Sequence, residues 1–114
     1  PQTCKSSFPK SMKVYIEQTV HNQIEQFYEE ALLKHDALDK LTVIKKIQRL
    51  YDALEALGDY AYIYPLARLK SDWIKNGYRE YICEDFHFAY QIYTLDDGER
   101  IVRIHDGVHS LLYF

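Results

Sequence analysis

Residues 86–94 have the sequence FHFAYQIYT, in which large apolar side chains occupy every second position for most of the run. Side chains of a β-strand point alternately to its two faces. One face of this strand is apolar and carries Phe86, Phe88, Tyr90 and Ile92. The other face carries His87, Ala89, Gln91 and Tyr93. We expect helices to cover the apolar face and the other face to be open, so a functional site is expected there.

Two further strands are predicted around this one, at residues 78–83 and 99–105. Glu84-Asp85 separates the first from the central strand, and residues 95–98 separate the central strand from the last. The pair Asp97-Gly98 is a strong hairpin signal, because both residues tolerate a positive φ. The three segments therefore predict an antiparallel meander at the end of the chain.

The first half of the chain predicts one short strand and two helices. Residues 13–18 alternate as a strand, and Thr19 suits a helix N-cap. Apolar residues recur at helical spacing up to about Lys34, and again from Val43 to Leu57, where Gly58 is placed as the C′ residue. Residues 59–77 are expected to form a long connection with one turn of helix.

The order strand, helix, helix and three strands predicts an α+β domain of two layers. A short connection makes the two helices an antiparallel hairpin, which must cover one face of a small, mainly antiparallel sheet. We expect residues 12–114 to form this single domain. Residues 1–11, PQTCKSSFPKS, have no such pattern and are expected to be a loose leader, with Met12 as the natural start.

Composition indicates a protein of a reducing, cytoplasmic setting. The two cysteines, Cys4 and Cys83, do not form the framework of a disulfide-rich protein, and no apolar run approaches the roughly 20 residues of a membrane span. The formal net charge is −3, so the overall field does not favour nucleic acid. A local basic patch remains compatible with RNA, since Arg68, Lys70 and Lys75 lie close together in the connection.

Three segments together resemble the RelE/ParE toxin superfamily: residues 76–82, NGYREYI, residues 86–92, FHFAYQI, and residues 101–107, IVRIHDG. The resemblance runs from Met12 to about Tyr113 and agrees with the element order. It implies the toxin of a bacterial type II toxin–antitoxin pair, silenced by a cognate antitoxin and needing no cofactor. Such a toxin is either a RelE-type endonuclease that cleaves messenger RNA on the ribosome or a ParE-type inhibitor of DNA gyrase. An inactive relative is the third interpretation.

The resemblance also implies a set of catalytic residues. Arg79 falls at a basic position of the second strand, and Tyr113 at a terminal tyrosine. His87 and His109 stand where arginines are usual. For a nuclease, the resemblance implies His109 as acid or base with His87 as its partner, Arg79 as phosphate clamp and Tyr113 as stacking or proton-transfer group. The acidic charge and the two missing arginines favour the other interpretations, whereas His109 with Tyr113 favours the nuclease.

Arg68, Lys70 and Lys75 are the predicted RNA-binding residues. The two histidines and Tyr113 also have interpretations without a catalytic role. His87 can be an open-face strand residue hydrogen-bonded to a neighbour, and His109 and Tyr113 can belong to an ordinary mobile tail.

Two other chemical interpretations have less support. His105 and His109 have a spacing found in some zinc sites, but no further ligands are indicated. Cys83 as a nucleophile lacks a partner and is better explained as a small buried strand residue.

Overall fold

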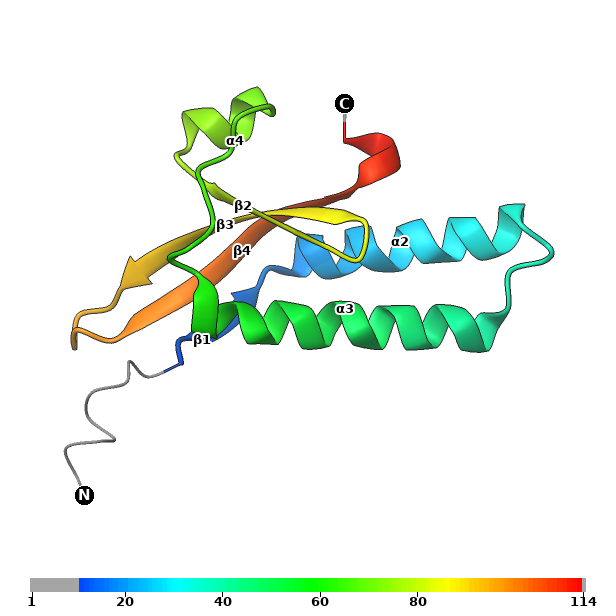
Figure 1. The fold of residues 1–114 in the computed structure, drawn as a ribbon, viewed down its shortest axis with the longest axis horizontal. Helices are drawn as coiled ribbons and strands as arrows, with labels where there is room; N and C mark the ends of the chain where they lie inside the picture. The colour runs from blue at the N-terminus through cyan, green and yellow to red at the C-terminus, as the bar shows by residue number, and fades with distance from the viewer. Residues whose placement is uncertain (1–10, 114) are drawn as a thin grey trace, which may run out of the picture.

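The computed structural model describes residues 11–113, so the expected leader lies almost wholly outside the described residues. Figure 1 shows two long antiparallel helices on one side of a sheet and a short helix on the other. The elements are β1 (Lys13–Ile16), α2 (Gln18–Lys34), α3 (Lys40–Tyr60), α4 (Ser71–Lys75), β2 (Arg79–Cys83), β3 (Phe86–Thr94), β4 (Arg100–His109) and the 3-10 turn η1 (Ser110–Leu112). The α+β class and the order of the elements are confirmed, and α4 is the helical turn expected in the connection.

The four strands form one sheet in the order β1-β4-β3-β2. The last three strands form the predicted antiparallel meander, and β1 adds to it parallel to β4. Gly98 has a φ of 87° and donates its N–H to the carbonyl of Leu95, which confirms the turn at Asp97-Gly98. β4 continues to His109, four residues further than expected.

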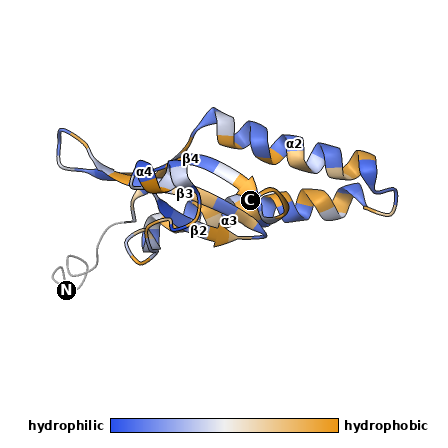
Figure 2. Ribbon diagram, turned by 90° about the horizontal axis from the view of Figure 1, so that it is seen from above, coloured by the Kyte–Doolittle hydropathy of each residue, from blue (hydrophilic) through white to orange (hydrophobic). Residues whose placement is uncertain are grey.

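The main core lies between the sheet and the two long helices. Phe86, Phe88 and Tyr90 are buried there, and Ile92 is partly buried beside them, as the alternation of β3 predicts. The helices contribute Val20, Ile24, Tyr28, Val43, Leu50, Leu54 and Leu57. Figure 2 shows hydrophilic and hydrophobic residues interspersed along α2 and α3, as in helices that bury one face.

Two predicted helix ends are wrong. Thr19 is not an N-cap, because α2 begins at Gln18 with Glu17 before it. Gly58 does not terminate α3 but lies inside it, where α3 crosses the start of β1. A Cβ at Gly58 would lie 2.0 Å from the carbonyl oxygen of Met12, and the Met12 N–H donates to the Gly58 carbonyl at 3.1 Å. The glycine is therefore needed for a close approach of two backbones, which a helix pattern does not reveal.

The face of the sheet away from α2 and α3 is open over only part of its length. Ala89 is completely buried in a second cluster with Ala67, Trp73 and Tyr113, which come from α4 and its flanks and from the C-terminal segment. The expectation of a wholly open face is wrong here, because residues distant in sequence fold back over it. Among residues 11–113, no helix combines the length and apolar character needed to cross a membrane.

Candidate functional site

A histidine and a glutamate are paired on the face of the sheet away from α2 and α3, here called the second face. Ile82 is in register with His87 and Glu80 with Ala89, so Glu80 and His87 are diagonal neighbours on adjacent strands. The His87 Nδ1 lies 2.8 Å from the Glu80 Oε2, and the two side chains are only 15% and 13% exposed. A carboxylate can only accept, so Nδ1 carries the proton and Nε2 the lone pair of the neutral ring. This arrangement suits a general base.

Tyr113 completes the cluster from the C-terminal segment. Its hydroxyl donates to the Glu80 Oε1 at 2.8 Å, and its ring stacks on His87 with 3.9 Å between centroids. Burial, then the bond to Glu80 and the charge of Glu80, raises the pKa of Tyr113 to about 12. The phenol is therefore protonated at neutral pH, and at 4% exposure it is not a mobile tail residue.

One predicted RNA-binding residue lies beside this cluster. The Lys70 Nζ is 5.9 Å from the centroid of the Tyr113 ring and 5.7 Å from that of Trp73. A hollow of about 390 Å³ opens there, lined by Leu69, Lys70, Ser71, Asp72 and Tyr113. Arg68 lines a separate, mainly apolar groove together with Glu80 and Ile82, and Lys75 is exposed at the end of α4. Lys70 is therefore the cation best placed to meet a phosphate at His87.

Arg79 is not part of this arrangement. Its position on β2 places it on the face toward α2 and α3, together with Tyr81 and Cys83. The guanidinium donates to the backbone carbonyls of Tyr62 and Tyr64, at 3.3 Å and 2.5 Å. Arg79 thus fastens the segment after α3 to the sheet, and the expected phosphate clamp is not brought to His87.

His109 also lies on the helix side of the sheet. Its ring stacks on Phe27 with 3.9 Å between centroids and meets the edge of Phe86. The Nδ1 accepts the N–H of Leu111 at 3.2 Å, which caps the 3-10 turn η1. Burial is the largest cause that lowers the pKa of His109 below 6.5. The predicted partnership of His87 and His109 is not formed. A β-bulge adds one residue to β4 between Ile104 and Asp106, so His109 pairs with Phe86 and shares its face, whereas His87 points to the opposite face.

Glu80 is the residue of this cluster that the sequence analysis missed. A signal for it existed, because a two-residue turn at Glu84-Asp85 places Ile82 opposite His87, and Glu80 then shares the face of His87. The alternation of the central strand alone does not include β2, so the carboxylate was not predicted.

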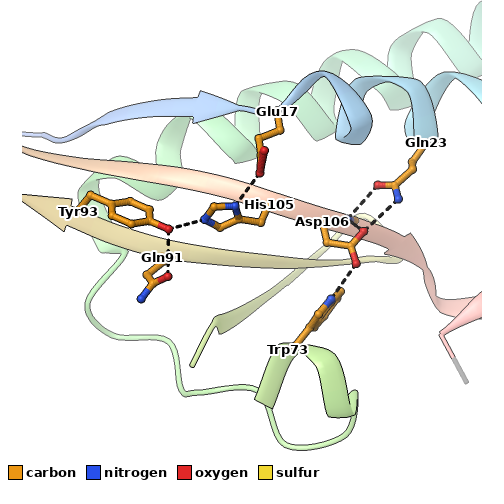
Figure 3. A network of polar contacts seen from close by, with 8 residues as sticks. Glu17, Gln23, Trp73, Gln91, Tyr93, His105 and Asp106 are labelled. Carbon is orange, nitrogen blue, oxygen red and sulfur yellow. Dashed lines mark hydrogen bonds and ion pairs between the residues drawn. The ribbon is translucent and has the colours of Figure 1, made fainter. Parts of the chain in front are cut away.

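A second polar network occupies the same face nearer the β3–β4 turn (Figure 3). Asp106 pairs with Ala89 and Ile104 with Tyr90, so His105 is the extra residue of a β-bulge. The His105 Nδ1 lies 2.6 Å from the Glu17 Oε2 and its Nε2 lies 2.8 Å from the Tyr93 hydroxyl. The bulge thereby aims two successive ionisable side chains, His105 and Asp106, to the face away from α2 and α3.

Neither of the minor chemical interpretations gains support from the geometry. His105 and His109 lie on opposite faces of the sheet, and within residues 11–113 no three His, Cys, Asp or Glu side chains gather as a metal site would need. Burial raises the pKa of the Cys83 thiol to about 12, so the thiolate is scarce at neutral pH.

Comparison of the chain with models of protein families, with curated proteins and with solved structures found no match in any of the three. The functional assignment therefore depends on the geometry of the residues and on the resemblance of the three sequence segments.

Proposed function

We propose that this protein is the toxin of a type II toxin–antitoxin pair and that it cleaves messenger RNA with His87 as the general base. The observation that carries the proposal is the Glu80–His87 pair, stacked on Tyr113 with Lys70 alongside. The place of action is the cytoplasm, where the ribosome presents the message and a cognate antitoxin silences the enzyme.

In the proposed reaction, the Nε2 of His87 takes the proton of a ribose 2′-hydroxyl. The 2′ oxygen bonds to the adjacent phosphorus as the bond to the 5′ oxygen breaks, which yields a 2′,3′-cyclic phosphate and a 5′-hydroxyl end. Glu80 stabilises the imidazolium that forms, and the ammonium of Lys70 stabilises the charge of the phosphorane. Tyr113 orients His87 and Glu80, and because its hydroxyl proton is engaged by Glu80, the leaving oxygen takes its proton from water.

The second candidate is a ParE-type inhibitor of DNA gyrase that performs no chemistry. Two observations favour it: Arg79 and His109 are held in structural contacts away from His87, and the formal net charge of −3 opposes approach to RNA. Lys70 partly offsets the unfavourable net charge, because its ammonium lies over the Tyr113 ring, next to the proposed general base.

The test is induction of the protein in a bacterium that lacks the antitoxin, with sequencing of transcript ends. We expect growth arrest and new cuts in translated messages, ending in a cyclic phosphate. His87→Gln should lower cleavage by about a hundredfold or more. His21→Gln is the matched control, because the His21 ring is likewise hydrogen-bonded, to the Tyr51 hydroxyl at 2.7 Å, and stacked, on the Tyr51 ring, but lies on α2 away from the site.

Intact messages together with blocked supercoiling by purified gyrase would replace the nuclease with the second candidate. Absence of growth arrest from a folded, well-expressed protein would reject both.

A further inference from the structure

The uncovered part of the second sheet face carries a row of three side chains across three strands. Tyr15 on β1 is in register with Arg103 on β4, and Arg103 is in register with Gln91 on β3. All three point away from α2 and α3, since Val14, Ile16, Val102 and Ile92 on the same strands pack toward the core. Neighbouring strands are about 4.8 Å apart, so the row is about 10 Å wide.

In the part of the chain that the structure describes, two cations in this region form no ion pair, and one aromatic ring beside them is exposed. Tyr15 is 47% exposed, and Arg103 is exposed, as is Lys13 two residues before Tyr15. Within residues 11–113, neither Arg103 nor Lys13 forms an ion pair. Uncompensated positive charge beside an exposed ring suits a ligand that combines phosphate groups with flat bases.

The third residue of the row, Gln91, is already oriented by the network in Figure 3. The Tyr93 hydroxyl donates to the Gln91 Oε1 at 3.1 Å, and Tyr93 is itself held by His105. The ring of Tyr78 stacks on His105 with 4.7 Å between centroids, which fixes the imidazole from a further side. With its oxygen engaged, the Gln91 amide presents N–H donors, which match the acceptor atoms of a base edge.

We propose that the row of Tyr15, Arg103 and Gln91 binds single-stranded RNA. One base stacks on Tyr15, the backbone phosphates pair with Arg103 and Lys13, and the amide of Gln91 donates to a base edge. His87 lies on the same face of β3, four residues or about 13 Å from Gln91. The row therefore holds the message on the same sheet face as the Glu80–His87 pair, on the other side of the cluster that covers Ala89. The choice of RNA rests on the proposed function, in which cleavage begins at a 2′-hydroxyl.

The test is the fluorescence anisotropy of a labelled single-stranded RNA about ten nucleotides long, titrated with the His87→Gln protein so that the RNA stays intact. Tyr15→Ala should weaken binding about tenfold and leave its salt dependence unchanged, because stacking involves no counterion. Arg103→Gln should reduce the slope of log affinity against log salt by about 0.7, measured between about 50 and 200 mM. Tyr60→Ala and Lys45→Gln are matched controls with exposed side chains on α3 and should bind like the parent.

Three results would overturn the inference. The first is no binding at about 50 mM salt. The second is equal binding by the parent, the Tyr15→Ala and the Arg103→Gln proteins. The third is displacement of the RNA by an acidic peptide of equal charge at equal concentration, which would indicate a surface that selects charge alone. Binding that depends on Tyr15 and Arg103, in a protein that cuts no message, would uphold this inference and reject the proposed nuclease.

Discussion

The imidazole ring of His87 lies nearly flat on the phenol ring of Tyr113, with 3.9 Å between centroids and 22° between planes. His87 comes from the middle of the sheet and Tyr113 from the end of the chain. The segment after β4 is therefore part of the candidate site, and its integrity should govern both stability and activity.

Tyr113→Phe and Tyr113→Ala should separate the stack from the hydrogen bond. The phenylalanine variant keeps the ring on His87 but loses the bond to the charged Glu80, at a cost of about 2 kcal/mol in the free energy of unfolding. The alanine variant also leaves a cavity beside Trp73 and should lose about 3 kcal/mol or more. Denaturant unfolding measures both values. An equal loss of unfolding free energy in the two variants would show that the packing of the Tyr113 ring does not stabilise the protein.

The free energy of unfolding should fall between pH 10 and pH 12. Burial is the largest cause that raises the pKa of Tyr81, Tyr90 and Tyr113 to about 12, from the ordinary 10.0 of a tyrosine. Above pH 10 the unfolded chain loses these protons before the folded chain does, so stability falls as the pH rises toward 12. Each group can contribute a slope of up to about 1.4 kcal/mol per pH unit. A free energy of unfolding that stays constant from pH 10 to 12 would contradict this assignment.

His109→Phe should reduce the sensitivity of the protein to acid. The pKa of His109 is lowered by burial, so below its usual 6.5 the unfolded chain binds this proton more readily, and stability falls as the pH falls. Phenylalanine preserves the stack on Phe27 and removes that titration. Unfolding curves from neutral pH to about pH 5 should therefore be flatter in the variant. RNA cleavage should persist, whereas its complete loss would restore His109 as a catalytic residue.

Gly58→Ala should destabilise the protein, although alanine is the better helix former by about 1 kcal/mol. The added methyl group would meet the Met12 carbonyl at 2.0 Å and push β1 away from α3, at an expected cost of about 1–3 kcal/mol. Ala56→Gly, at an exposed site of the same helix, should cost about 1 kcal/mol by propensity alone. A gain of stability in Gly58→Ala would show that this close approach is absent in solution.

Trp73→Phe should loosen α4 from the sheet. The indole N–H donates to the Asp106 Oδ2 at 2.8 Å, while Gln23 on α2 donates to the Oδ1 of the same carboxylate (Figure 3). Loss of one bond to a charged group should cost about 1–3 kcal/mol.

The same contact can be tested from the Asp106 side by fluorescence. Trp73 is the only tryptophan, so Asp106→Ala should raise the iodide quenching of its fluorescence. Asp52→Ala, on the exposed surface of α3, should leave the quenching unchanged.

The sequence by itself determined the class of the fold. Alternation along residues 86–94 identified the buried face of β3, and helical spacing identified α2 and α3. These features are predictable because strand and helix periodicities depend on near neighbours in the chain, and because an apolar face must be covered. Gly58 and Thr19 were misplaced because both predictions considered local signals alone.

The candidate site was decided by the tertiary structure. The β-bulge at His105 reverses the side on which the rest of β4 points, so His109 lies toward the helices. Arg79 is engaged by carbonyls after α3, and Tyr113 returns to the face that carries His87. Each of these contacts joins residues distant in the sequence. The Glu80–His87 pair was predictable from the two-residue turn at Glu84-Asp85. The other contacts depend on bulges and chain reversal, which no local pattern of residues encodes.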